Sequence, residues 1–360
     1  MKLMILANSD IGLYAFRKEL IEEFVKEHEV IVVVPFEKKI DQLKRLGGTY
    51  INASINRRGT NIFQDYKLLK NYKKYMKQEK PDIVITYTIK PNIYGGMAAK
   101  SLNIPQIANI TGLGTAVENK GLLQKITTIL YRIALRKAHT VFFQNEENML
   151  YFQKNKIALG KHELIPGSGV NLTHFNLTPY PTDKIIKFVF VSRIMKEKGI
   201  DLYLNSAKYF MSKYNNLEFH ICGSLDENYN SKIESLVRNN TIIYHGVVND
   251  VKKIIDEMHA IIHPTYYPEG MSNVLLEAAA IGRPGIASNR SGCKEIIDDG
   301  TSGYLFEPQN QILLDECIQR FINLSFEDKK TMGIRAREKV EVYFDRQIVI
   351  NRYLESIRKV

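Results

Sequence analysis

Two glutamates, Glu269 and Glu277, frame a short segment that otherwise has the apolar pattern of a buried helix. An apolar run ending in His-Pro-Thr precedes them, and a Gly-Arg-Pro-Gly turn follows them. This order predicts a strand, a turn that carries Glu269, and a helix that begins near Met271 or Ser272, with Ser272 or Asn273 at its cap. The unpaired N–H groups at such a helix start favour a bound anion.

The backbone N–H groups of Gly270, Met271 and Ser272 are therefore expected to face a ligand. At 100° per residue, Glu277 lies about 80° beyond two full helical turns from Glu269. The two carboxylates would then contact different parts of one elongated ligand. The alternative is that Glu269 only offsets the helix dipole and Glu277 only caps a loop.

Two cations form a second candidate site in the stretch FVFVSRIMKEKGID. Arg193 follows an apolar strand, and Lys198 comes just before a glycine and a helical pattern. Arginine binds phosphate through bidentate hydrogen bonds and lysine as a point charge, so the pair suits a diphosphate. The alternative is that both are solvated loop cations.

The turn after the first apolar run, in ANSDIGLYAF, is a third candidate. Gly12 would let the backbone approach a phosphate or a sugar closely there. The turn lacks the G-x-G-x-x-G fingerprint of dinucleotide sites. The sequence also contains no D-x-D pair, which is the pattern that would indicate a metal site.

Apolar runs alternate with helical patterns in both halves of the chain, which favours an α/β fold with two parallel sheets, each covered by helices on both faces. The expected strands span 2–8, 29–36, 81–88, 105–111 and 140–145, then 187–193, 217–223, 241–246, 260–265 and 284–288. The expected helices include 13–28, 199–214 and a terminal helix at 341–360. The polar stretch 171–184 indicates a linker between domains at 1–170 and 185–340.

The composition is that of a soluble globular protein with two domains: 360 residues, 44% hydrophobic and 25% charged. Its three cysteines, Cys222, Cys293 and Cys317, form no C-x-x-C pair. This pattern indicates neither a disulfide framework nor a zinc site and is typical of a reducing cytoplasm. The first apolar run breaks at Asn8, too early for a signal peptide or an anchor.

The net charge of +11 comes entirely from the first half of the chain. Residues 1–178 hold 26 basic and 15 acidic residues, whereas 179–360 hold 24 of each. The asymmetry indicates an anionic partner, namely nucleic acid, a phosphorylated substrate or an anionic lipid surface, with solubility alone as the alternative. Residues 119–139 have the pattern of a basic amphipathic helix on an anionic membrane, although an ordinary domain helix would share it. Its cations are Lys125, Arg132, Arg136 and Lys137.

Several motifs occur in one register: S-R-x-x-x-E-K-G at 192–199, E-G followed by E-A at 269–278, and G-x-P at 282–284. With the segments 165–175 and 291–306, they resemble the retaining glycosyltransferases of family 4. Those enzymes have the GT-B fold, two Rossmann-like domains facing a central cleft, with a C-terminal helix that can return to the N-terminal domain. Segments 56–70, 86–100 and 109–114 resemble a bacterial subgroup that adds sugars to polyprenyl-diphosphate-linked glycans of capsule, O-antigen or glycoprotein pathways.

The resemblance implies a UDP-sugar donor and neither a cofactor nor a metal. Arg193 and Lys198 would stabilise the departing diphosphate. Glu269 would contact the transferred sugar, and Glu277 the ribose hydroxyls. Donors to sugar and phosphate would come from the helix start, at Gly270, Met271, Ser272 and Asn273. The base would lie beside His245 and Gly246, and donor would meet acceptor near Gly12.

The chain departs from the family at one position. Many members carry a histidine where this chain has Thr111, and no nearby histidine replaces it. Tyr87, Thr88 and Lys90 are the candidate substitutes. His263, at a strand end, is expected to have a supporting or core role.

These features predict a retaining, metal-independent glycosyltransferase that moves a hexose or N-acetylhexosamine to a lipid-linked saccharide in surface polysaccharide synthesis. It would be cytoplasmic and peripheral on the inner face of the cell membrane, and it would not bind nucleic acid. Two alternatives remain open: a UDP-sugar epimerase of similar fold, and a basic nucleic-acid-binding protein, for which no binding motif is present. The motifs do not determine the donor sugar, the acceptor glycan, the linkage position or the oligomeric state.

Overall fold

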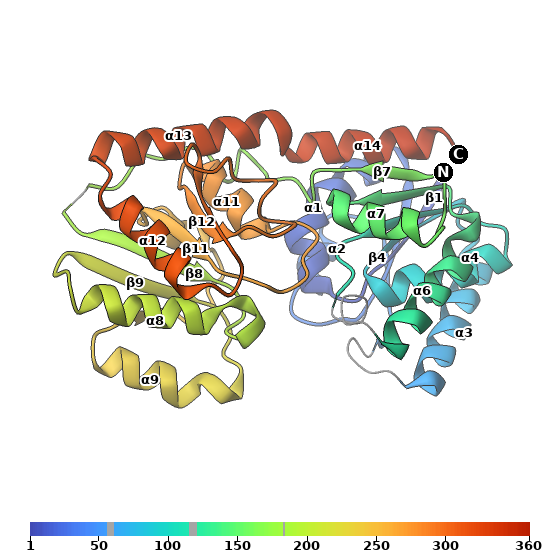
Figure 1. Cartoon of the computed structure of the whole chain (residues 1–360). Coiled ribbons are helices and arrows are strands. Elements are labelled where there is room, and N and C mark those ends of the chain that lie inside the picture. Colours follow the sequence, from blue (N-terminus) through green and yellow to red (C-terminus); the bar gives the residue numbers. More distant parts are fainter. Residues whose placement is uncertain (56–60, 115–120, 183) are drawn as a thin grey trace. The chain divides into compact units, whose positions relative to one another are not determined.

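The computed structural model of the chain describes residues 1–55, 61–114, 121–182 and 184–360. Residues 56–60 and 119–120 of the predicted motifs, and residue 183 of the predicted linker, lie outside the described residues. The chain forms two compact units, labelled by element in Figure 1. Unit 1 comprises 1–168, 268–271 and 347–360, and unit 2 comprises 169–267 and 272–346.

Unit 1 is built on a parallel sheet in the order β3-β2-β1-β4-β5-β6-β7. Alternate residues of the central strand β1 point to opposite faces, and both faces are covered. Leu3 and Ile5 pack with helices α1 and α14, whereas Met4 and Leu6 pack with α3 and α4. The strands are β1 (Lys2–Leu6), β2 (Glu29–Val34), β3 (Thr49–Asn52), β4 (Ile83–Tyr87), β5 (Gln106–Ile110), β6 (Thr140–Phe143) and β7 (His162–Leu164).

The helices of unit 1 follow the strands in the alternation that the sequence predicts, and they include the end of the chain. The Tyr353 ring packs 4.7 Å from Phe142, and its hydroxyl accepts a hydrogen bond from Asn109 Nδ2 at 2.7 Å. These contacts fix α14 on unit 1, so the C-terminal helix does return to the N-terminal domain. The helices are α1 (Asp10–Glu27), α2 (Ile40–Lys44), α3 (Ile62–Glu79), η1 (Pro91–Gly95), α4 (Gly96–Ser101), α6 (Leu122–Ala134), η2 (Leu135–Lys137), α7 (Glu146–Lys154) and α14 (Arg346–Arg358).

Unit 2 has a second parallel sheet in the order β10-β9-β8-β11-β12-β13. Phe188 and Phe190 of the central strand pack with α8 and α12 in one apolar core. The strands are β8 (Ile186–Val191), β9 (Leu217–Cys222), β10 (Ile243–Tyr244), β11 (Ala260–His263), β12 (Gly285–Ser288) and β13 (Gly303–Phe306). The helices are η3 (Lys196–Lys198), α8 (Ile200–Met211), η4 (Glu227–Tyr229), α9 (Asn230–Arg238), α10 (Lys252–Ile255), α11 (Asn273–Ile281), α12 (Gln311–Ile322) and α13 (Phe326–Tyr343).

The prediction of one continuous terminal helix at 341–360 is wrong in one respect, because the helix is broken near its start. Helix α13 ends at Tyr343 and α14 begins at Arg346. Between them, Val170 N–H donates to Phe344 O, and Arg346 N–H donates to Val170 O. These two bonds replace the usual helical bonds at the break, and the sequence around 340–360 carries no sign of that distant partner.

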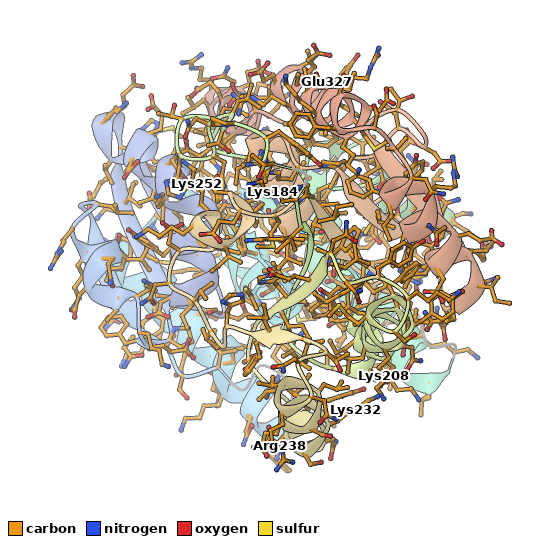
Figure 2. The ribbon with its side chains drawn as sticks, turned by 90° about the vertical axis from the view of Figure 1, so that its left-hand side faces the viewer. Lys184, Lys208, Lys232, Arg238, Lys252 and Glu327 are labelled. Carbon is orange, nitrogen blue, oxygen red and sulfur yellow. The ribbon has the colours of Figure 1, made fainter. Side chains whose placement is uncertain are left out.

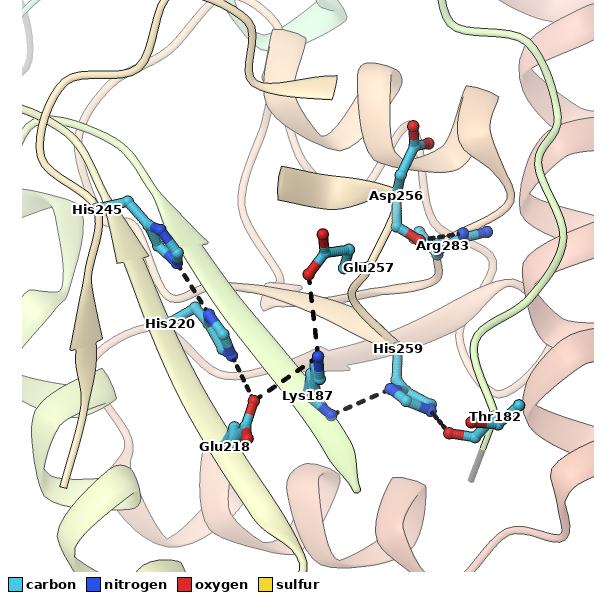
Figure 3. A network of polar contacts seen from close by, with 9 residues as sticks. All are labelled: Thr182, Lys187, Glu218, His220, His245, Asp256, Glu257, His259 and Arg283. Carbon is cyan, nitrogen blue, oxygen red and sulfur yellow. Dashed lines mark hydrogen bonds and ion pairs between the residues drawn. The ribbon is translucent and has the colours of Figure 1, made fainter. Parts of the chain in front are cut away.

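The predicted linker has no helix or strand among its described residues, and it lies within unit 2. Arg283, which is only 1% exposed, holds it in place. Its guanidinium donates to Thr178 O, Pro179 O and Asp256 O at 3.3, 2.9 and 2.6 Å. Figure 3 shows the bond to Asp256.

Candidate active site

The loop from β8 to α8 brings the two predicted cations together. Arg193 Cζ lies 6.0 Å and Lys198 Nζ 4.8 Å from the centre of the Tyr267 ring, so both cations are close to the same aromatic ring. Gly199 ends this loop with φ +76°, and a Cβ there would lie 2.0 Å from Pro264 O. Only glycine fits this position, and it fixes where Lys198 leaves the backbone.

The loop from β11 to α11 lies at the same edge of the sheet, because β8 and β11 are parallel neighbours. Tyr266 N–H donates to Glu197 O at 2.9 Å and ties the two loops together. The cations and the start of α11 therefore belong to one edge of unit 2. This edge is where ligands of open α/β sheets bind.

Ser272 is the N-cap of α11, as predicted, but its own N–H is not free. It donates to Gly292 O at 2.8 Å, so the expectation that this N–H faces a ligand is wrong. No side chain caps the helix, because Ser272 Oγ lies 3.2 Å from His263 Nε2 instead. The N–H groups of the first helical turn, beginning at Asn273, can still serve a ligand. Asn273 Oδ1 is also buried without a hydrogen-bond partner among the described residues.

The turn that carries Glu269 belongs to unit 1. Asn145, the N-cap of α7, donates from Nδ2 to Glu269 O at 3.2 Å and to Gly270 O at 2.6 Å. A Cβ on Gly270 would lie 2.5 Å from Thr111 O and from Gln144 Oε1. Gly270 is therefore required for the backbone to pack here, and Thr111 lies beside the turn.

Glu277 lies in the middle of α11 and is only partly exposed. Burial raises the pKa of its carboxyl to about 7, and the Arg346 guanidinium offsets this only in part. An ionised Glu277 is therefore costly until a partner donates hydrogen bonds to it. A diol in contact with this carboxyl would supply such bonds.

His245, at the end of β10, is part of a polar network shown in Figure 3. Its ring stacks on His220 with centroids 5.2 Å apart, and its Nε2 lies 2.9 Å from His220 Nδ1. His220 Nε2 lies 3.0 Å from Glu218 Oε2 and donates to it. In the neutral ring His220 Nδ1 then accepts from His245, which leaves His245 Nδ1 as an acceptor. Burial lowers the pKa of both histidines, so both are neutral near pH 7.

Gly12 lies in other surroundings than predicted, and Lys90 is held in an ion pair. Helix α1 begins at Asp10, so Gly12 lies in its first turn rather than in a preceding loop, and its N–H donates to Ser9 Oγ at 3.3 Å. The predicted free backbone turn at Gly12 is thus wrong, because Ser9 caps the helix earlier. Lys90 Nζ lies 2.6 Å from Asp65 Oδ1 and lines a pocket of about 330 Å³ in unit 1.

Comparisons with known proteins cover both units. A model described as "Glycosyl transferase 4-like" matches residues 2–145, and one described as "Glycosyl transferases group 1" matches 175–339. The chain is a family 4 glycosyltransferase. This glycosyltransferase has the GT-B fold. Neither matched family is that of an epimerase or a nucleic-acid-binding protein.

Relatives of this glycosyltransferase align with both of its units. It is 26% identical, over 100% of its own chain and 99% of the relative, to the N,N'-diacetylbacillosaminyl-diphospho-undecaprenol alpha-1,3-N-acetylgalactosaminyltransferase of Campylobacter jejuni. It is 27% identical, over 78% and 75%, to the UDP-Gal:alpha-D-GlcNAc-diphosphoundecaprenol alpha-1,3-galactosyltransferase of Escherichia coli. Anabaena HepE, solved with UDP and glucose, has a TM-score of 0.83 at 15% identity, with 100% of both chains covered.

Three contacts of this glycosyltransferase were not predicted from the sequence. They are those of Tyr267 with the two cations, of Asn145 with the Glu269 turn, and of His220 with His245. Each contact joins residues that are distant in the sequence, so no local motif marks it. Asn145 alone left a signal, as a polar residue shortly after a buried strand.

The described ranges contain neither a candidate membrane span nor a candidate metal site. Within them, no helix of the glycosyltransferase has the length and apolar character needed to cross a bilayer. No group of three histidine, cysteine or acidic side chains in the same ranges is arranged to hold a metal ion. The three cysteines are buried and unbridged.

Proposed function

We propose that this glycosyltransferase moves a hexose or N-acetylhexosamine from a UDP-sugar to a hydroxyl of a lipid-linked saccharide, with retention of anomeric configuration. The observation that carries the proposal is the approach of Arg193 and Lys198 to the ring of Tyr267, at the sheet edge where α11 begins. Two cations and a helix start are the groups that a diphosphate leaving group requires.

The charge that develops in the reaction lies on the diphosphate. As the bond from the anomeric carbon to the phosphate oxygen breaks, negative charge grows on that oxygen, and Arg193 and Lys198 stabilise it there. The acceptor hydroxyl attacks from the same face and passes its proton to the departing phosphate. Retention follows because the bond forms on the side where the old bond breaks. No cofactor takes part in this scheme.

The carboxylates orient the donor rather than attack it. Glu277 accepts hydrogen bonds from the ribose hydroxyls, which favours its ionised form despite burial. Glu269 contacts hydroxyls of the transferred sugar, with Gly270 and Met271 beside it. Asn273 donates to phosphate or sugar. His245 Nδ1 faces the base, beside Gly246.

The acceptor class rests on the relatives, two of which are named for undecaprenyl-diphosphate-linked substrates. The one-sided basic charge suits such an anionic, membrane-bound acceptor. We therefore place the enzyme at the inner face of the cell membrane, attached peripherally through unit 1, in synthesis of a surface polysaccharide. Acceptor-side contacts would come from Thr111 and Lys90.

The test is binding of a panel of UDP- and GDP-sugars by thermal shift, followed by turnover on a lipid-diphosphate sugar. Lys198→Ala should lower kcat by roughly 10²–10³-fold, as loss of one transition-state donor does. Glu269→Ala should reduce turnover with folding intact. Lys208→Ala, an exposed lysine of α8, is the matched control. Near-normal rates in both site variants refute the assignment, and interconversion of UDP-sugars without acceptor would indicate an epimerase.

A further inference from the structure

Helix α6 is apolar on the side that faces away from the protein. Leu122, Ile126, Ile129 and Ile133 are 75, 44, 51 and 45% exposed. They recur every three or four residues, so they form one continuous ridge along the helix. The opposite side, with Tyr131 and Ala134, is buried in the core of unit 1. We call these four residues the α6 ridge.

A basic groove runs along one flank of this ridge, between α6 and α7. It has a volume of about 450 Å³ and is lined by Lys125 and Arg132 of α6 and Lys154 of α7. The hydroxyls of Thr128 and Tyr151 lie 2.6 Å apart within it. Ile129 belongs to both the ridge and the groove, so the two surfaces are continuous.

The charges in the groove are not neutralised by the protein. No ion pair involves Lys125, Arg132 or Lys154 in the described part of the chain. Arg132 donates from Nη2 to Asn155 O at 2.8 Å, which leaves its other N–H groups for a ligand. The nearest acidic residues on α7, Glu146 and Glu147, lie in its first turn, about 11–12 Å along the axis from Lys154.

Cations beside an exposed apolar ridge suit a molecule that has a phosphate next to a hydrocarbon chain. We propose that the groove binds the phosphate of an anionic glycerophospholipid while the α6 ridge inserts among the acyl chains. A nucleic acid would satisfy the cations but leave the isoleucines in water. The inference rests on the proposed membrane attachment and deepens it, because it assigns a headgroup site and an inserted surface.

The first test is flotation with vesicles of phosphatidylcholine, with and without phosphatidylglycerol and free of any polyprenyl lipid. Each cation near an anionic surface is worth about 1 kcal/mol, which is about fivefold in binding. The triple variant Lys125→Gln, Arg132→Gln, Lys154→Gln should therefore lose about a hundredfold in binding to the anionic vesicles. The matched control replaces two exposed lysines and one arginine of unit 2, Lys184, Lys208 and Arg238, labelled in Figure 2.

The control triple removes the same charge, but none of its residues lines the groove, so it should bind as the unchanged protein does to within about threefold. Equal losses in the two triples would mean that net charge alone matters, which overturns the groove. Binding that appears only after polyprenyl diphosphate is added would overturn it as well, in favour of an acceptor site.

The second test concerns the ridge. Replacing Leu122, Ile126 and Ile133 by serine should make vesicle binding strongly salt-sensitive, because only screened electrostatic attraction remains. Unchanged salt dependence would show that the ridge does not insert. All three side chains are exposed, so the fold should tolerate the change, and circular dichroism checks this.

A third measurement separates this inference from the proposed function. Turnover on a short-chain, water-soluble acceptor should be unchanged in the groove and ridge variants, because no membrane is involved. Loss of turnover there in both variants would overturn the inference by placing these residues in catalysis. If the unchanged protein fails on that acceptor while the vesicle results hold, the proposed function fails and the lipid site stands.

Discussion

Replacement of Glu277 by glutamine tests the role of this residue in the absence and presence of the donor. In the free protein, burial holds the pKa of Glu277 near 7, against 4.5 in an unfolded chain. Between these two values the folded form keeps a proton that the unfolded form has lost. Stability therefore falls as pH rises through this window, and the full penalty applies above pH 7.

The size of the penalty follows from the shift. A difference of about 2.5 pH units corresponds to about 3 kcal/mol of unfolding free energy at pH 8. Glu277→Gln removes the charge and should raise the melting temperature at pH 8 by about 4 °C. At pH 4.5 the variant and the original protein should melt together. Glu234→Gln, an exposed residue of α9, is the control and should change neither value.

Donor binding should show the opposite preference for charge. Ribose hydroxyls donate to the ionised carboxyl, so a UDP-sugar should bind about tenfold more tightly at pH 8 than at pH 6 and release a proton near pH 7. Calorimetry in buffers of different ionisation enthalpy measures that proton. Glu277→Gln should bind the UDP-sugar more weakly at pH 8, without proton release.

Two results would contradict this role of Glu277. An unchanged melting temperature for Glu277→Gln at pH 8 would show that Glu277 carries no desolvation cost. A UDP-sugar affinity that stays flat from pH 6 to pH 8 would show that Glu277 does not contact the donor. A UDP-sugar is used because its diphosphate, unlike that of UDP, has no terminal phosphate to titrate in this range.

Three further changes test the framework of the site. Gly199→Ala should lower the free energy of unfolding by about 1–3 kcal/mol by urea denaturation, and more than Gly300→Ala, which has a similar φ of +73° but no neighbour within 4 Å. Asn145→Ala removes two hydrogen bonds to the Glu269 turn, so kcat should fall with at most about 1–3 kcal/mol of lost stability; unchanged kcat would count against the positioning role. Burial lowers the pKa of His220, so below pH 6.5 the unfolded chain binds a proton there more readily than the folded chain; thermal melts should show stability falling below that pH, and less steeply in His220→Asn.

The sequence by itself determined the elements and the local chemistry. Alternating strand and helix patterns predicted two parallel sheets, because a strand buried on both faces must be apolar throughout. The order of Arg193, Lys198 and a glycine before a helix predicted a phosphate-binding loop, and Ser272 was the correct cap. Spacing over a few residues is enough for such predictions, since strand and helix periods are local properties of the backbone.

Tertiary structure decided what lies opposite each element. The break before α14 depends on Val170, the Glu269 turn is held by Asn145, and Ser272 N–H is taken by Gly292. Helix α6 is the clearest case, because its sequence is apolar on two sides and either could have faced the core. Packing against β5 and β6 buried the side with Tyr131 and left the α6 ridge exposed. Which side of a helix is covered depends on contacts between residues that are distant in the sequence.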